Sequence, residues 1–145
     1  MIKIDNNIKS TLKFIDYVVD ESFYTTNKNF KEEPVQLDIK IGKEISISEK
    51  NDELFVILKC EIFEDAVKKN YPFSLSVKIT GIFGISEIPE ENINNLVNIN
   101  AVSILFPYVR ALISTLTASF NVQPLILPPI NVLKLFENDI EEPSK

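Results

Sequence analysis

Side chains that most often perform chemistry are scarce in this chain of 145 residues. There is no histidine, which removes the commonest general base and metal ligand. The single cysteine, Cys60, lies among apolar residues, which favours a packed thiol over a nucleophile, and one thiol cannot form a zinc–thiolate cluster. Three glycines are too few for a glycine-rich phosphate loop. We therefore predict no catalytic residues, no metal site and no cofactor.

Carboxylates are the remaining groups that could catalyse a reaction, as a facing pair in a hydrolase. They gather in polar turns, as in Glu49, Asp52, Glu53, Glu64, Asp65, Glu90 and Glu91. Acids in such turns are typical of solvated loops. A carboxylate enzyme is therefore a minority hypothesis, and it would require a substrate-sized pocket with two facing acids. We predict that the protein is not an enzyme.

The composition, 45% hydrophobic and 25% charged, is that of one globular domain. We expect this domain over residues 1–138, followed by an acidic, disordered tail at 139–145. The net charge of −6 repels phosphate backbones, which argues against nucleic-acid partners. We find neither a signal-peptide core nor an uncharged apolar window of membrane-spanning length. With a single cysteine, these features predict a cytoplasmic protein that does not insert into membranes.

Apolar and polar residues alternate through the first half of the chain, a pattern typical of half-buried strands. It predicts four strands, over Thr11–Tyr24 with a bulge near Ile15–Asp16, then Val35–Ile47, Leu54–Ile62 and Tyr71–Thr80. Asp65–Asn70 is expected to be a polar connection. Short connections indicate an antiparallel sheet. Gly81 and Gly84 predict a bend or a close backbone approach.

The spacing of apolar residues changes to three or four after Pro89. Pro-Glu-Glu predicts a short helix over Glu90–Asn98. A long amphipathic helix follows, containing Pro107 and an apolar stripe at Val102, Leu105, Val109, Leu112, Leu116 and Phe120. Val122–Ile130 is proline-rich and predicts an extended loop, and Asn131 can cap a last helix. The predicted fold class is α+β, a four-stranded antiparallel sheet packed with a long helix and a shorter C-terminal helix.

Two motifs in the C-terminal third carry a resemblance to a known family. Leu105–Arg110 reads LFPYVR, and Pro124–Phe136 reads PLILPPINVLKLF. They resemble the LFPYAR and PxLxLxPxNFxxLF patterns of the SecB family of protein-export chaperones. Thr80–Ile85 and Pro34–Ile39 echo two further family motifs, so the resemblance spans most of the chain. It implies an ATP-independent holdase that binds unfolded or nonnative polypeptides as a homotetramer, a dimer of dimers, and passes them to the SecA motor.

The resemblance also implies the residues of the site. The client groove corresponds to Phe30, Phe73, Phe83, Tyr108, Val122, Leu125, Leu127 and Phe136, with the proline-rich loop as one wall. Phe73 and Phe136 could equally be core residues. The long helix would lie at the oligomer interface, through Leu105, Val109, Leu112 and Leu116. Asp20 matches an acid of the SecA-docking face, whereas Tyr24, Ser74 and Ser76 replace its other docking residues.

A second hypothesis remains open beside the general holdase. A SecB-like protein could be a dedicated binding module for one partner, such as an antitoxin. The range of bound polypeptides separates the two, because a holdase binds many unfolded chains and a dedicated module binds one.

Overall fold

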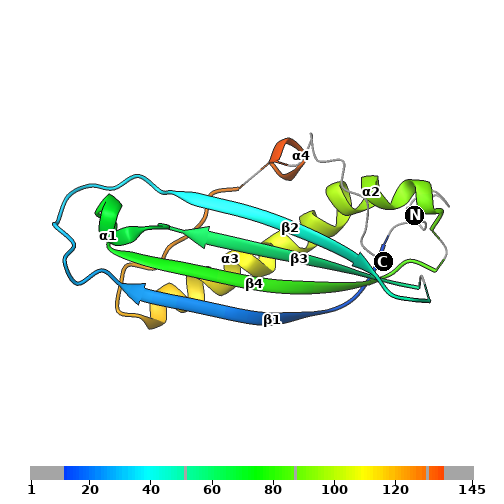
Figure 1. Cartoon of the computed structure of the whole chain (residues 1–145), viewed down its shortest axis with the longest axis horizontal. Coiled ribbons are helices and arrows are strands. Elements are labelled where there is room, and N and C mark those ends of the chain that lie inside the picture. The colour runs from blue at the N-terminus through cyan, green and yellow to red at the C-terminus, as the bar shows by residue number, and fades with distance from the viewer. Residues whose placement is uncertain (1–11, 51, 87, 130, 136–145) are drawn as a thin grey trace, which may run out of the picture.

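A computed structural model describes residues 12–50, 52–86, 88–129 and 131–135 of the chain. Its sheet has four antiparallel strands in the order β1-β4-β3-β2. Figure 1 shows these strands as β1 (Lys13–Thr26), β2 (Ile39–Ile47), β3 (Glu53–Ile62) and β4 (Phe73–Gly84). The helices are α1 (Ala66–Lys69), α2 (Ile93–Leu96), α3 (Val102–Ser119) and α4 (Val132–Leu135). The predicted α+β fold is confirmed.

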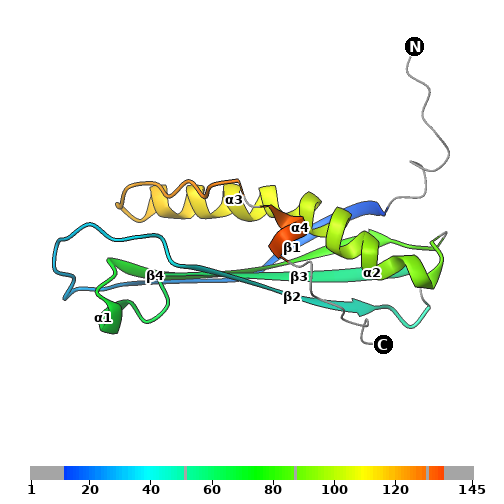
Figure 2. The same ribbon diagram turned by 90° about the horizontal axis from the view of Figure 1, so that it is seen from above.

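The sheet has one covered and one open face. Figure 2 shows α3 and α4 on the same side of the sheet, with α3 running along most of its length. Because side chains alternate across a strand, every second residue of β3 and β4 points toward α3. These residues form the core and are almost completely buried: Leu54, Val56, Leu58, Cys60, Ile62, Phe73, Leu75, Val77, Ile79 and Phe83.

Cys60 belongs to this core, and burial raises the pKa of its thiol to about 12. The thiol therefore stays protonated near neutral pH, where only a thiolate would act as a nucleophile. This burial confirms the prediction of a packed thiol.

Strand β1 contains the predicted bulge. Its pairing with β4 shifts between Phe14 and Asp16, and it shifts again between Val19 and Glu21, which the sequence pattern did not indicate. The first shift places Phe14 and Tyr17, three residues apart, on the face toward α3. This bulge is the physical reason why the apolar residues of β1 shift from even to odd positions along the strand.

Gly81 permits the close approach of α3 to the sheet. A Cβ atom on Gly81 would lie 2.5 and 2.6 Å from the two terminal methyl carbons of Leu105, which is fully buried. The expected close backbone approach is thus confirmed at Gly81, whereas the nearest atom to a Cβ on Gly84 would be 3.5 Å away.

We expect Gly81→Ala to lower the free energy of unfolding by about 1–2 kcal/mol, because a methyl group would overpack this contact. Gly42→Ala is a matched control, because a Cβ atom there would meet nothing within 4 Å. Urea denaturation measures both variants. Equal changes in the two would contradict the account of the Gly81 contact.

Two expected connections differ in the structure. The second strand begins at Ile39 rather than Val35, because residues 27–38 form a connection held by side chains outside the sheet. The expected polar connection Asp65–Asn70 contains the short helix α1, flanked by Asp65 and Asn70 in the left-handed conformation. Asparagine and aspartate tolerate this conformation better than most residues.

The helical region is more continuous than expected. A 3₁₀ turn (Glu90–Asn92), α2 and a π-helical stretch (Val97–Ala101) lead directly into α3, which runs through Pro107 without interruption. The expected cap of the last helix is present, since the backbone N–H of Lys134 donates to Asn131 Oδ1 at 3.3 Å. The predicted tail at 139–145 lies outside the described residues.

Helix α3 is the one segment, within the described part of the chain, that is long and apolar enough to cross a membrane, with a mean hydropathy of 1.3 over 18 residues. The expectation from the sequence excluded only an uncharged apolar window of this length, and α3 contains the charged residue Arg110. In the structure the inner face of this helix packs on the sheet through Leu105, Val109 and Ile113, as the core helix of a globular domain does.

Candidate functional site

Apolar side chains are exposed mainly along β1 and at one point of the proline-rich loop. On β1, Ile15, Val18, Val19 and Phe23 are 43–64% exposed, and Ile126 of the loop is 75% exposed. Contiguous exposed apolar surface on a globular protein usually marks an interaction site. Val19 pairs with Ile79 on the α3 side of the sheet, whereas Val18 and Phe23 pair with Thr80 and Ser76 and face the open side. Ile126 lies in the loop beside α3, so the surface around this helix is the first candidate site and the open face is the second.

One group of aromatic rings, which we call the Tyr108 cluster, joins α3 to β1. The ring of Tyr108 lies 4.4 Å from that of Tyr17 and 5.7 Å from that of Phe14, and Phe14 lies 5.5 Å from Phe83. Tyr108 and Tyr17 are more than a third exposed, whereas Phe83 is fully buried. The cluster therefore presents two accessible rings on a fixed aromatic base, an arrangement suited to binding an apolar side chain.

A second group, the Phe73 row, crosses the end of the sheet beside α1. Successive ring centroids are 4.2–5.4 Å apart, running through Tyr71, Phe63, Phe73, Tyr24 and Phe120. Phe73 is 5% exposed, and Tyr24, Tyr71 and Phe120 are half-buried. The row thus connects the α1 turn to the C-terminal end of α3.

The predicted groove aromatics fall into two separate places. Phe73 pairs with Thr26 on β1, whereas Tyr108 contacts Tyr17, nine residues earlier on the same strand. At about 3.3 Å per residue the two places are roughly 30 Å apart. Phe30 is half-buried in the connection before β2, and Phe136 lies outside the described residues. A single client would need to be extended to reach both places.

The connection that carries Phe30 is held by two asparagines. Asn27, which is 6% exposed, donates from Nδ2 to the carbonyls of Ala66 and Tyr71 at 3.2 and 2.9 Å. Asn70 accepts from the backbone N–H of Lys31 at 2.9 Å and donates to its carbonyl at 3.0 Å. These bonds fix the connection next to the Phe73 row.

The proline-rich loop is fastened to α3 by side chains of that helix. Arg110 donates from Nε and Nη2 to the carbonyl of Leu127 at 3.1 and 2.8 Å. Ser114 donates to the carbonyl of Leu125 at 3.0 Å, and the N–H of Leu125 donates to Thr117 Oγ1 at 2.8 Å. Figure 2 shows the loop running back alongside α3. Arg110, Ser114 and Thr117 of α3 therefore hold this loop in place.

Several predicted groove residues are part of the chain's own core. Phe83 and Leu127 are fully buried, so they can support a groove but do not line its surface in this structure. Val122 and Leu125 are half-buried, and they are the predicted loop residues that remain partly accessible.

The residues predicted to form the oligomer interface are also partly or fully buried within the chain. Leu105 and Val109 are at most 1% exposed because they face the chain's own sheet, and Leu112 and Leu116 are half-buried. The apolar spacing of three or four residues identified the inner face of α3. The same spacing is expected for a helix that packs on its own sheet. On the outer face of α3, Ala111, Thr115 and Ala118 are exposed.

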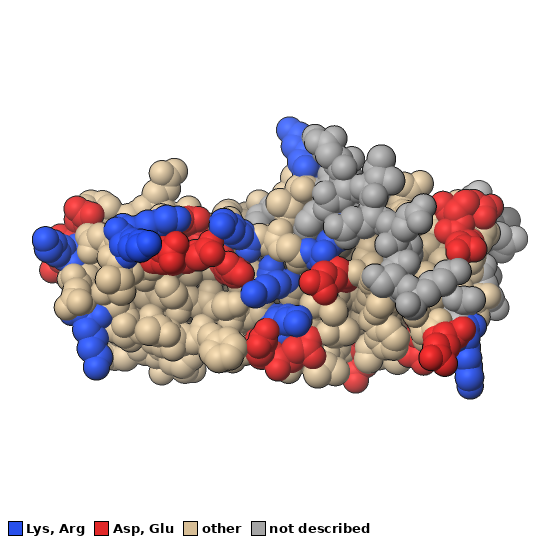
Figure 3. Space-filling model, viewed as in Figure 1, with Lys and Arg blue, Asp and Glu red and all other residues tan. Residues whose placement is uncertain are grey.

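The open face of the sheet carries mixed charges. Figure 3 shows basic and acidic side chains side by side on this face, without a single acidic field. Asp20 lies here and accepts a hydrogen bond from the Thr80 hydroxyl. The acid of the predicted docking set is therefore partly engaged within the chain itself.

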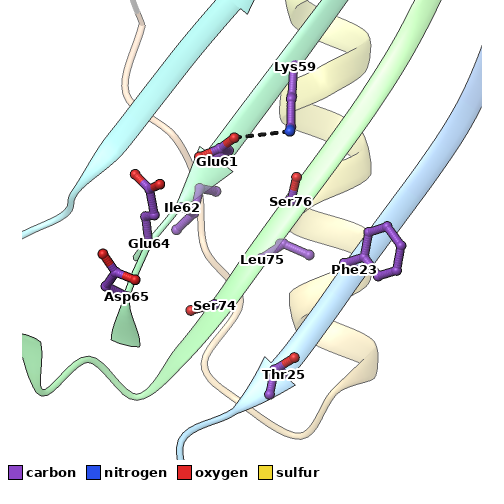
Figure 4. Close-up of a pocket in the computed structure, with 10 residues that line it drawn as sticks. All are labelled: Phe23, Thr25, Lys59, Glu61, Ile62, Glu64, Asp65, Ser74, Leu75 and Ser76. Atoms are coloured by element: carbon purple, nitrogen blue, oxygen red, sulfur yellow. Dashed lines mark ion pairs between the residues drawn. The ribbon is translucent and has the colours of Figure 1, made fainter. Parts of the chain in front are cut away.

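A shallow hollow of about 290 Å³ lies on the same face (Figure 4). Its lining includes Phe23, Ser76 and the acids Glu61, Glu64 and Asp65. Glu61 pairs with Lys59 at 3.2 Å, and Glu64 pairs with Lys40, which lowers the pKa of that carboxyl. A general acid needs a raised pKa, so the hollow is poorly suited to the carboxylate hydrolase that the sequence left open. Within the described residues, no group of three side chains could hold a metal ion.

Known proteins resemble this chain over most of its length. The family model described as preprotein translocase subunit SecB matches residues 8–143. An uncharacterised protein of Methanocaldococcus jannaschii is 40% identical over 136 residues, 92% of this chain and 87% of the relative. The protein-export protein SecB of Nitrobacter winogradskyi is 30% identical over 128 residues, 86% of this chain and 80% of that protein.

A solved structure shows the same fold. It is the SecB-like chaperone of Mycobacterium tuberculosis in complex with a peptide from an antitoxin. The TM-score is 0.70 at 14% identity, and the match covers 86% of this chain and 94% of that chain.

Proposed function

Because this chain belongs to the SecB family of protein-export chaperones, we propose that it is an ATP-independent holdase for unfolded or nonnative polypeptides. The family match over residues 8–143 is the observation that carries the proposal. The family is one of chaperones, not of enzymes, which fits the scarcity of catalytic side chains. A holdase needs accessible apolar surface rather than reactive groups, because it stabilises exposed segments of its clients by binding them.

We place client binding on the α3 side of the sheet, at the Tyr108 cluster and the proline-rich loop. Tyr108, Val122 and Leu125 would contact the client, with Phe30 and Phe136 extending the surface. Phe73, Phe83 and Leu127 would support it from below. The two aromatic groups lie far enough apart to engage separate segments of one extended chain, and binding at two linked places raises the overall affinity.

We further propose that the chain works as a cytoplasmic homotetramer with one domain over residues 1–138. The outer face of α3, with small residues at Ala111, Thr115 and Ala118, would let a second helix approach closely. SecA is a candidate partner through Asp20. Because the open sheet face carries mixed charges, we expect it to attract a basic partner less strongly than an acidic face would.

Suppression of aggregation tests the holdase proposal. A chemically denatured model protein is diluted into buffer without nucleotide, and light scattering is followed in the presence of increasing amounts of this protein. We expect near-complete suppression at about one oligomer per client. The absence of suppression at several-fold excess would contradict the proposal.

A dedicated binding module for one partner, such as an antitoxin, is the second candidate. The SecB-like chaperone of similar fold was solved with an antitoxin peptide, which motivates this alternative. Strong binding to a single protein, with no effect on the aggregation of unrelated unfolded proteins, would favour it over the general holdase.

A further inference from the structure

The backbone of the proline-rich loop has two edges, and only one of them is used by α3. The carbonyls of Leu125 and Leu127 and the N–H of Leu125 are bonded to Arg110, Ser114 and Thr117. In an extended segment, the N–H and C=O of one residue point to the same side, and successive residues alternate. Bonds at residues 125 and 127 therefore turn the backbone groups of residue 126 away from the helix.

The outward edge of the loop points away from α3. In the part of the chain that the structure describes, no hydrogen bond reaches the backbone N–H or C=O of Ile126, nor the carbonyls of Pro124 and Pro128. Ile126 is 75% exposed, and Pro124 and Pro128 are exposed as well. The edge thus offers one donor and three acceptors along five residues, flanked by the apolar side chain of Ile126.

We propose that this outward edge, centred on Ile126, binds an extended client segment through β-type backbone hydrogen bonds. The inference rests on the proposed holdase function and deepens it. Ile126 would exchange two bonds with one client residue, and the carbonyls of Pro124 and Pro128 would accept from client N–H groups. The occupant is an unfolded polypeptide segment with free backbone N–H groups, not a folded surface.

The geometry suits a chaperone of many clients. Backbone bonds are the same for every non-proline sequence, so they add affinity without restricting the client. The three α3 side chains hold the loop in place before binding, which reduces the conformational entropy that an ordering loop would lose. The loop prolines at 124, 128 and 129 limit the unbound conformations further and keep the segment from joining a helix.

Two substitutions at one position separate the backbone from the side chain. Ile126→Pro removes the N–H, whereas Ile126→Ala keeps the N–H and shortens the side chain. Binding of a fluorescently labelled, permanently unfolded protein is measured by anisotropy with the full-length chain. We expect the proline variant to bind about threefold to tenfold more weakly than the alanine variant, as the loss of one hydrogen bond predicts. Equal affinities of the two variants would overturn the inference.

A second measurement uses the unaltered protein, in case proline at position 126 displaces the loop. A short apolar peptide is compared with the same peptide methylated on every interior amide nitrogen. We expect the methylated peptide to bind at least tenfold more weakly, because it has no backbone donors, and equal binding would again overturn the inference. If the unaltered protein binds neither peptide nor the unfolded protein, the holdase proposal itself fails.

Discussion

Replacing Tyr108 with alanine is expected to weaken the binding of an unfolded client about thirtyfold while leaving the chain folded. Large aromatic residues at the centre of binding surfaces often contribute about 2 kcal/mol or more, and 1.4 kcal/mol corresponds to a factor of ten. Tyr108 is 37% exposed, and its ring lies against Tyr17 and Phe14. The lost ring contacts should lower the free energy of unfolding by only about 0.5–1.5 kcal/mol each.

Val67→Ala is the control for removing an exposed apolar side chain. Val67 is 70% exposed on α1, away from α3, so its loss should leave client affinity unchanged. Anisotropy titrations measure both variants, and urea denaturation and light scattering check the fold and the oligomer. A Tyr108→Ala protein that binds as tightly as the Val67→Ala protein would remove the Tyr108 cluster from the site.

Thr117→Val should lower the free energy of unfolding by about 1–3 kcal/mol and also weaken client binding. Thr117 is fully buried, and its hydroxyl accepts the bond from Leu125 N–H while donating to the Ile113 carbonyl at 2.8 Å. Valine has the same shape but no hydroxyl, so the Leu125 N–H would be left without its acceptor. A buried polar group that loses its partner carries such a cost.

Thr25→Val is the matched control, because the Thr25 side chain is exposed on β1, away from the proline-rich loop and from the proposed helix interface. We expect a change of less than about 0.5 kcal/mol there, as for most surface substitutions. Urea denaturation gives both stabilities, and hydrogen exchange at Leu125 reports directly on the loop. Similar stabilities and similar exchange in the two variants would show that Thr117 does not hold the loop.

The local sequence pattern was enough to predict the strands and helices of the fold. Alternation predicted the four strands, and the change of parity near Ile15 predicted the bulge that places Phe14 and Tyr17 on one face. Gly81 was expected to permit close packing, and it does so against Leu105. These features depend on residues close in sequence, or on the absence of a side chain at one glycine.

Features that join distant segments could not be predicted in the same way. The bonds from Asn27 and Asn70 link residues about 39 positions apart, and an asparagine in a turn has many other uses. The loop-holding role of Ser114 and Thr117 could not be predicted, because small polar residues on a helix suit close helix packing as well as holding a loop. Periodicity identified Leu105 and Val109 as an apolar stripe, but it does not distinguish a core from an interface.

The candidate site shows the same limit. The resemblance supplied the groove residues, but the approximately 30 Å between Phe73 and Tyr108 depends on their register against β1. The outward edge at Ile126 had no signal in the sequence, since its direction follows from the bonds made by its two neighbours, Leu125 and Leu127.

Binding to the unfolded and the native forms of the same proteins is the most direct test of the holdase proposal. Several unrelated proteins are labelled, each is prepared in native and in permanently unfolded form, and the affinity of the full-length chain for each is measured without nucleotide. We predict binding to all the unfolded forms with affinities within about tenfold of one another. We predict no measurable binding to the native forms. Equal binding to native and unfolded forms, or no binding to any unfolded form, would contradict the account.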